Sequence, residues 1–175
     1  MSRLSSISCV VPCLNEDANL NVLLPQLLAV LADAAPAFEI IVVDDGSSDG
    51  TALSMSRWVA EHPEIVYVQL SRNFGKEAAM SAGFEIAKGQ VVASLDADLQ
   101  HPPALIPEML KRWEEGADMV YAVRASREDE SAFKRVGTKL FYQLMRESGG
   151  IKVPENAGDF RLMDRRGGDA LLLLP

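Results

Sequence analysis

The stretch Glu39-Ile-Ile-Val-Val-Asp-Asp-Gly-Ser-Ser-Asp-Gly-Thr51 joins an apolar run to a cluster of turn-forming residues. The run Glu39–Asp44 is rich in β-branched residues and lacks polar alternation, which is typical of a strand buried on both faces. The Asp-Gly pairs that follow are ordinary turn signals, and one interpretation of Ser48 or Asp49 is that it caps a helix after the turn. A buried strand that leads through a turn into a helix predicts one unit of an α/β fold.

Further strands and helices alternate along the chain. Four other runs have the composition of strands, and they cover residues 7–11, 65–70, 90–95 and 118–123. Three segments repeat their apolar residues at helical spacing, namely the leucines between residues 20 and 31, residues 106–113 after a proline pair, and residues 131–146. The alternation predicts a single domain over residues 1–175, with a three-layer α/β/α architecture and a mainly parallel sheet.

The composition limits the class of protein. The chain has 175 residues, 48% of them hydrophobic, and a formal net charge of -8. Residues 1–119 contain 17 Asp and Glu against 7 Lys and Arg, whereas residues 120–175 contain 10 Lys and Arg against 8 acids. The acidic balance argues against nucleic-acid binding, and an anionic partner is expected to meet the more basic last third.

Cysteine usage and hydropathy indicate a cytoplasmic domain. Cys9 and Cys13 are too few for a disulfide scaffold, and in a strand they would lie about 13 Å apart, too far for a disulfide. We therefore expect buried thiols in a reducing cytoplasm. Neither a signal peptide nor a membrane-spanning run is visible. The chain stops inside the apolar segment Ala170–Pro175, and we expect further sequence to follow it.

Acidic residues follow two of the expected strands. Asp44 and Asp45 come after one strand, and Asp96 and Asp98 come after another. Because parallel strands end at the same edge of a sheet, these carboxylates are expected to converge, and they would repel one another without a cation. In an extended Asp-x-Asp segment both carboxylates point the same way, and Gln100 adds an oxygen at the next position on that side. Such hard oxygen ligands predict Mg²⁺ or Mn²⁺ bound together with a diphosphate.

Five motifs extend this pattern over nearly the whole chain, whereas neither a dinucleotide-binding G-x-G-x-x-G motif nor a P-loop is present. The motifs are VVPCLNE (10–16), VVDDGSSDGT (42–51), SRNFGKEAAMSAG (71–83), SLDADLQHPP (94–103) and NAGDFRLMDRR (156–166). Together they resemble the family 2, A-type glycosyltransferases. More narrowly, they resemble the polyprenyl-phosphate group, which includes dolichol-phosphate mannose synthase and bacterial undecaprenyl-phosphate glucosyl and aminoarabinosyl transferases.

The resemblance implies a reaction and a set of site residues. The family transfers a sugar from a nucleotide diphosphate to the phosphate of a membrane polyprenol, with inversion at the anomeric carbon and with Mg²⁺ or Mn²⁺. The metal would be bound by Asp96, Asp98 and Gln100, and the catalytic set would be Asp98, Asp159 and Arg161. Asp44 and Asp45 would hold the base or the ribose. The full set implied for the nucleotide sugar is Pro12, Asn15, Glu16, Asp44, Asp45, Lys76, Asp96 and Ala97.

The acceptor would be a phosphate monoester with a charge of about -1.5 to -2 at neutral pH. It needs little or no deprotonation to attack, so the protein's task becomes positioning and charge management. Arginine suits phosphate oxygens because of its forked donors. The basic last third supplies five cations for the acceptor side, Arg124, Arg127, Lys134, Arg135 and Arg161. The alternating charges around Arg124 and Arg127 are also typical of a solvated loop.

Several alternatives stay open at this stage. A glycosyltransferase of the same fold could act on a saccharide hydroxyl, for which it would need a carboxylate base, and a non-catalytic nucleotide-sugar-binding module is the other alternative. Similarity to bacterial members favours a UDP-sugar over GDP-mannose, undecaprenyl phosphate as the acceptor, and the cytoplasmic membrane face as the location. Bacterial members often continue into an amphipathic helix and transmembrane helices, which would be missing here. A homo-oligomer is compatible with the sequence, and His101 is expected to pack or cap.

Overall fold

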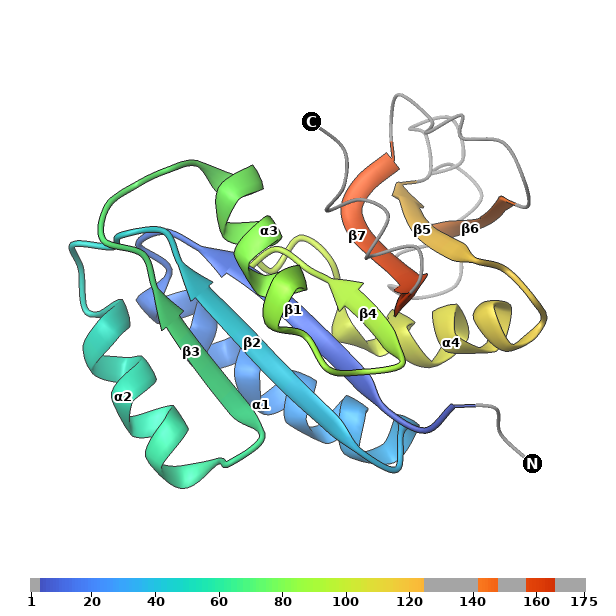
Figure 1. The fold of residues 1–175 in the computed structure, drawn as a ribbon, viewed down its shortest axis with the longest axis horizontal. Helices are drawn as coiled ribbons and strands as arrows, with labels where there is room; N and C mark the ends of the chain where they lie inside the picture. Colours follow the sequence, from blue (N-terminus) through green and yellow to red (C-terminus); the bar gives the residue numbers. More distant parts are fainter. Residues whose placement is uncertain (1–3, 125–141, 148–156, 166–175) are drawn as a thin grey trace, which may run out of the picture.

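The computed structural model describes residues 4–124, 142–147 and 157–165, and these form one sheet with helices on both of its faces (Figure 1). The strands are β1 (Ile7–Cys13), β2 (Phe38–Asp44), β3 (Ile65–Gln69), β4 (Val91–Ser94), β5 (Met119–Arg124), β6 (Tyr142–Glu147) and β7 (Ala157–Asp164). The helices are α1 (Asp17–Ala34), α2 (Thr51–Glu61), α3 (Lys76–Ile86), the short 3₁₀ turn η1 (Pro103–Leu105) and α4 (Ile106–Glu114).

The sheet has a parallel half and an antiparallel half, and its strand order is β3-β2-β1-β4-β7-β5-β6. β1 pairs in parallel with β2 and β4, and β2 pairs in parallel with β3. β7 lies between β4 and β5 and is antiparallel to both, while β6 extends the sheet beyond β5. The expected α/β class with helices on both faces is confirmed, and the parallel part of the sheet is the part that begins at the N-terminus.

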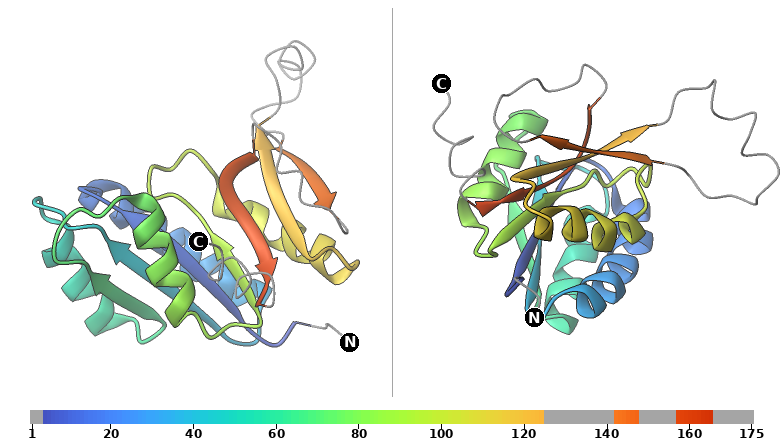
Figure 2. Two further views of the ribbon diagram at one scale, coloured as in Figure 1. Left: turned by 45° about the horizontal axis from the view of Figure 1, so that its top comes forward. Right: turned by 90° about the vertical axis from the view of Figure 1, so that its right-hand side faces the viewer.

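The two faces of the sheet have separate hydrophobic cores. Along β1, Cys9 and Val11 pack into the core with α1 and α4, whereas Val10 packs into the core with α3. This is the alternation expected of a strand, in which successive side chains point to opposite faces. The right-hand view of Figure 2 shows α3 on one face and the other helices opposite. The cysteines are confirmed as buried free thiols.

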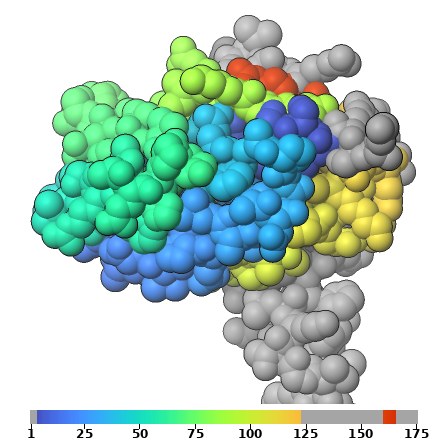
Figure 3. Space-filling view, turned by 90° about the horizontal axis from the view of Figure 1, so that it is seen from below, coloured from blue at the N-terminus to red at the C-terminus, as the bar shows by residue number. Residues whose placement is uncertain are grey.

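Leucines build α1, as their spacing predicted. The buried face of α1 consists of Leu20, Leu23, Leu24, Leu27 and Leu31. Seen from below, on the side where the parallel strands begin, α1 lies in blue between the teal α2 and the yellow α4 (Figure 3). No helix within the described parts of the chain is both long enough and apolar enough to cross a membrane.

The five strands expected from the sequence are confirmed to within two residues at each end. The prediction of a helix over residues 131–146 is wrong at its C-terminal end, because Tyr142–Glu147 forms strand β6. Residues 131–141 lie outside the described residues. The physical reason is the free edge of β5, which β6 occupies from Met119↔Glu147 to Arg124↔Tyr142. A short apolar run fits a helix or a strand equally well, so a long-range partner decides between them.

Gly83 permits α3 to lie close to β1. A Cβ atom at this position would collide with Cγ1 of Val10 and would come 3.2 Å from Cγ2 of Val43. Glycine normally lowers helix stability by about 1 kcal/mol relative to alanine. The close approach of α3 to the sheet therefore explains why glycine stands at position 83, although glycine is unfavourable within a helix.

We expect Gly83→Ala to destabilise the fold by about 1–2 kcal/mol, because overpacking outweighs the gain in helix propensity. The control is the same substitution in a Val10→Ala background, where the colliding methyl groups are absent. There the cost of Gly83→Ala should fall to zero or become a gain, as measured by urea unfolding in a double-mutant cycle. An equal cost in both backgrounds would show that another contact limits the approach of α3.

Candidate active site

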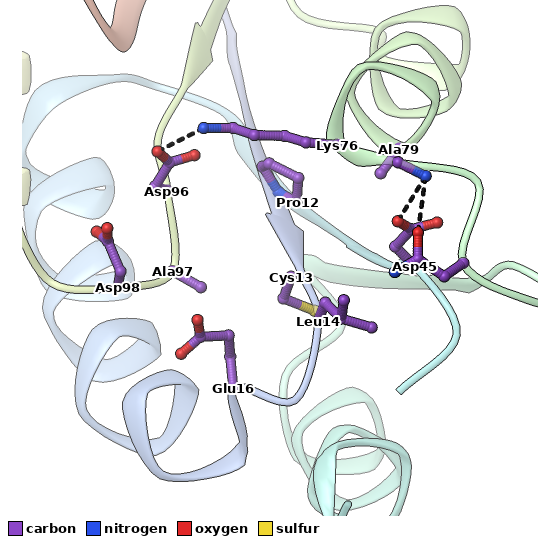
Figure 4. Close-up of a pocket in the computed structure, with 12 residues that line it drawn as sticks. Pro12, Cys13, Leu14, Glu16, Asp45, Lys76, Ala79, Asp96, Ala97 and Asp98 are labelled. Carbon is purple, nitrogen blue, oxygen red and sulfur yellow. Dashed lines mark hydrogen bonds and ion pairs between the residues drawn. The ribbon is translucent and has the colours of Figure 1, made fainter. Parts of the chain in front are cut away.

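A pocket of about 310 Å³ opens at the edge where the parallel strands end (Figure 4). It lies between the carboxyl ends of β1, β2 and β4 and the start of α3, which is where ligands bind in open α/β sheets. Its lining residues are Pro12, Cys13, Leu14, Glu16, Asp45, Asn73, Gly75, Lys76, Ala79, Asp96, Ala97 and Asp98. Seven of the residues expected at the nucleotide sugar or the metal are in this set: Pro12, Glu16, Asp45, Lys76, Asp96, Ala97 and Asp98.

Asp96 and Asp98 stand on a turn after β4, not on an extended segment. Leu99 takes a left-handed backbone conformation, with φ 62°, and the backbone N–H of Gln100 donates to Oδ1 of Asp98 at 3.0 Å. Ala97 between the two acids is buried, whereas Asp98 and Gln100 are exposed. Figure 4 shows the two carboxylates on the same side of the pocket. The turn therefore still brings both acids to one place, although by a different geometry from the expected one.

The two acids at the end of β2 have different environments. Asp44 is fully buried, and its carboxylate accepts hydrogen bonds from the backbone N–H of Ser47 at 2.7 Å and from the hydroxyl of Tyr67 at 2.6 Å. Asp45 lines the pocket and accepts from the backbone N–H groups of Phe74 at 2.7 Å and Gly75 at 2.9 Å. Asp44 thus lies outside the pocket lining and holds its own loop, while Asp45 fixes the turn before α3.

Tyr67 remains a hydrogen-bond donor at every pH of interest. Burial, and then the neighbouring Asp44 carboxylate, raise the pKa of Tyr67 above its ordinary range. The protonated hydroxyl can therefore always donate to Asp44, which needs such donors because it is buried.

Asn15 joins the first loop of the site to the second. It has a left-handed φ of 57°, its backbone N–H donates to Oγ of Ser47 at 2.8 Å, and its side-chain oxygen accepts from the N–H of Ser48 at 2.8 Å. Asn15 is not part of the pocket lining, whereas its neighbour Glu16 is. The structure therefore places Asn15 where it positions the loop that begins at Asp44.

Asp49 joins the starts of two helices. One of its oxygens accepts from the backbone N–H of Thr51, where α2 begins, and the other accepts from that of Asp17, where α1 begins. The hydrogen bonds from Thr51 hold the pKa of Asp49 below its usual range. Asp49 thus binds the start of both helices, although the N-cap residue of α2 is Gly50 and not Asp49.

Gly46 is required because two loops of the site cross at this point. Its φ is +81°, and a Cβ atom would lie 2.6 Å from the backbone carbon of Arg72. The Asp-Gly turn signal of the sequence therefore marks more than a turn, since it also marks a close backbone approach.

The remaining expected residues lie near the antiparallel half of the sheet. Arg161 is half-buried in β7, opposite Ser94 of β4 and Tyr121 of β5, and Asp159 precedes it in the same strand. Arg124 is the last residue of β5. His101 packs edge-on against Phe160, with ring centroids 5.8 Å apart. Three acceptor-phosphate residues, Arg127, Lys134 and Arg135, lie outside the described residues.

Five lining residues were not expected from the sequence, namely Cys13, Leu14, Asn73, Gly75 and Ala79. Asn73, Gly75 and Ala79 belong to the motif SRNFGKEAAMSAG after β3, from which the sequence predicted only Lys76 for the site. Within the described parts of the chain, no group of three or more His, Cys, Asp or Glu residues is arranged to hold a metal ion.

Comparison with known proteins identifies the family. Residues 8–170 match the model of glycosyl transferase family 2, and the chain belongs to this family. It is 46% identical over 169 residues to an uncharacterized glycosyltransferase of Synechocystis sp., covering 97% of this chain and 53% of that protein. It is 37% identical over 169 residues to the bactoprenol glucosyl transferase of Shigella phage SfV, covering 97% of this chain and 55% of that protein. The chain thus spans about half the length of these relatives.

Solved structures support the expected fold. A mannosyltransferase from Pyrobaculum calidifontis, in complex with GDP-Man and Mn²⁺, aligns with 97% of this chain and 47% of its own at a TM-score of 0.66 and 21% identity. The glucosyl-3-phosphoglycerate synthase of Mycobacterium tuberculosis aligns with 93% of this chain and 58% of its own at a TM-score of 0.61 and 19% identity. The predicted A-type glycosyltransferase fold is therefore confirmed.

We expect Tyr67→Phe to destabilise the protein by about 1–3 kcal/mol, because the buried Asp44 carboxylate loses a donor that burial prevents water from replacing. Urea unfolding measures the change. An unfolding midpoint equal to that of the unsubstituted chain would show that Asp44 does not depend on this hydroxyl.

We expect Cys9 and Cys13 to resist alkylation in the folded protein. Burial raises the pKa of both thiols to about 12, and for Cys13 the carboxylates of Asp44 and Glu16 add to the effect. At pH 8 the thiolate population should be about a thousandfold lower than in the unfolded chain. As the pH rises, the thiols ionise in the unfolded chain before they ionise in the folded one, which favours unfolding. The contribution of the neutral thiols to the free energy of unfolding is therefore complete below about pH 9 and is lost between about pH 9 and 12. Mass spectrometry after iodoacetamide treatment, with and without urea, measures the protection; equal labelling would contradict it.

Proposed function

We propose that this chain is the catalytic domain of a glycosyltransferase that moves a sugar from a nucleotide diphosphate to the phosphate of a membrane polyprenol. The observation that carries the proposal is the pocket in which Asp45, Lys76, Asp96 and Asp98 meet. It combines carboxylates suited to a divalent ion with a cation suited to phosphate. The similarity to bactoprenol glucosyl transferases, at 37% identity over 97% of this chain, supports the polyprenyl acceptor.

The residues of the turn after β4 fit a divalent metal ion. Carboxylate oxygens are hard ligands, and Mg²⁺ or Mn²⁺ is commonly held by one or two carboxylates while phosphate oxygens and water complete its shell. Asp96 and Asp98 would hold the ion, and Gln100 follows them on the same turn. When bound there, a divalent ion supplies Lewis-acid stabilisation of the departing diphosphate.

The remaining lining residues would bind and orient the donor. Pro12, Glu16 and Asp45, which line the pocket, would contact the nucleoside, and Asp44 and Asn15 would keep the loop that begins at Asp44 in position. Cys13, Leu14, Ala79 and Ala97 give the pocket apolar walls. We take a UDP-sugar as the donor, with GDP-mannose as the competing candidate, and the cytoplasmic face of the membrane as the place of reaction.

The transfer itself needs little acid or base catalysis from the protein. An acceptor phosphate oxygen forms a bond to the anomeric carbon on the face opposite the diphosphate. The bond from that carbon to the diphosphate oxygen breaks, and its electron pair leaves with the nucleoside diphosphate, so the configuration inverts. The acceptor is already an anion, and positioning therefore matters more than a general base. Arg161 and Asp159 of β7, with Arg124, Arg127, Lys134 and Arg135, are our candidates for holding the acceptor.

We expect Asp98→Asn to weaken Mn²⁺-dependent binding of UDP-glucose more than tenfold, because the turn loses a charged ligand. Calorimetric titration of the chain with UDP-glucose and GDP-mannose, with Mn²⁺ or Mg²⁺, measures the loss and identifies the base. The matched control is Asp118→Asn, which makes the same charge change at the opposite edge of the sheet, where β5 begins. Equal effects of the two substitutions would contradict a metal site at Asp98.

The acceptor is tested by offering the protein radiolabelled donor with undecaprenyl phosphate in detergent, with a saccharide, or with neither. We expect label in the organic phase only with undecaprenyl phosphate, and less of it with Asp98→Asn. Label transferred to the saccharide instead would replace the proposed acceptor with a hydroxyl. Donor binding without any transfer would favour a non-catalytic nucleotide-sugar-binding module.

A further inference from the structure

Lys76 reaches across the pocket to the first acid of the turn after β4. Its Nζ lies 2.7 Å from Oδ2 of Asp96, at both hydrogen-bond and ion-pair distance (Figure 4). The side chain of Lys76 is 40% exposed and that of Asp96 is 19% exposed, so solvent reaches the lysine more easily than its partner. The ammonium group thus pairs with a carboxylate that the proposed function assigns to a divalent ion.

The main chain of Lys76 is held in place by another residue of the pocket. Lys76 is the first residue of α3, and Gly75 before it has a φ of 100°. The Asp45 carboxylate accepts from the backbone N–H groups of Phe74 and Gly75 and so fixes the turn that leads into the helix. The four-carbon side chain of Lys76 therefore moves from a fixed point, and it can change its partner without any movement of the helix.

We propose that Lys76 is an exchangeable counter-ion, which neutralises Asp96 before metal and nucleotide bind and moves to the diphosphate of the donor when they do. The inference rests on the proposed function and adds a coupling to it. Metal and nucleotide would each bind more tightly in the presence of the other. The metal ion releases Lys76 from Asp96 for the diphosphate, and the diphosphate draws away the ammonium group that competes with the metal ion.

Electrostatics gives the direction of each effect. A divalent ion at Asp96 must displace the ammonium, and two cations beside one carboxylate repel each other. A diphosphate offers Lys76 a new anionic partner, and hydrogen bonds between charged groups are the stronger ones. An ion pair that is exposed to solvent contributes little to stability, so exchanging its partner costs little. Coupling between two ligands is reciprocal, so UDP strengthens Mn²⁺ binding by the same factor as Mn²⁺ strengthens UDP binding.

The test is Lys76→Met, which should change the two affinities in opposite directions. Without nucleotide, we expect it to bind Mn²⁺ about threefold more tightly than the unsubstituted chain, because the competing cation is gone. At saturating Mn²⁺, we expect it to bind UDP, or GDP if that is the preferred base, about tenfold more weakly, because the diphosphate loses a charged donor. Electron paramagnetic resonance of free Mn²⁺ measures the first affinity, and calorimetry measures the second.

Two further variants separate this role from a general effect of charge. Lys88→Met removes the same charge at the opposite edge of the sheet, beside Gly89 and Glu39, and should leave both affinities unchanged. Lys76→Arg keeps a cation at the pocket and should restore both affinities to within about twofold. Circular dichroism and unfolding midpoints establish that each variant is folded.

The outcomes are distinct. Opposite changes in Lys76→Met, with both control variants close to the unsubstituted chain, support the exchange. Mn²⁺ affinity that stays equal or falls in Lys76→Met overturns it, and so does unchanged nucleotide affinity; either result leaves the proposed function standing. Failure of the unsubstituted chain to bind UDP or GDP in the presence of Mn²⁺ overturns the proposed function, and the exchange with it.

Discussion

The parallel pairing of β1 with its two neighbours is the constraint on which the rest of the structure depends. β1 is buried along its whole length, and its register joins Cys13 to Asp44 on one side and Val10 to Ser94 on the other. Strands that run in parallel end at one edge of the sheet, so the pairing alone brings together the loops that follow β1, β2 and β4. The apolar residues of these strands thus determine where the acids lie, and the last two residues of β1, Pro12 and Cys13, also line the pocket.

The acids at this edge divide into those that maintain the protein and those that remain available to a ligand. Asp44 and Asp49 accept hydrogen bonds from their own loop, and also from the hydroxyl of Tyr67 in β3 and the backbone N–H of Asp17 in α1, respectively. Asp45 does both, because it lines the pocket while it accepts from the turn before α3. Asp98 is exposed, and its carboxylate accepts from the backbone N–H of Gln100 in its own turn. Among the described residues, repulsion between these acids is thus relieved mainly by backbone and hydroxyl donors, and Lys76 adds a cation beside Asp96.

Much of this arrangement could be predicted from the sequence. β-branched runs identified the parallel strands, and the rule for parallel edges brought Asp45, Asp96 and Asp98 together. Adjacent acids could not be distinguished, because which of Asp44 and Asp45 faces the pocket depends on how the strand ends. The ion pair of Lys76 depends on how α3 packs. Strands β6 and β7 could not be assigned, since their partners are distant in the sequence and antiparallel pairing is decided by those partners.

The insertion of β7 between β4 and β5 has a consequence for the order in which the protein is made. The parallel half of the sheet and the pocket acids lie before residue 100, and they can assemble while the rest of the chain is still on the ribosome. β5 emerges next, but it has no place beside β4 until β7 is synthesised. The nascent chain therefore completes the edge that carries the pocket acids first, and the strand that carries Asp159 and Arg161 closes the sheet only at the end of translation of this region.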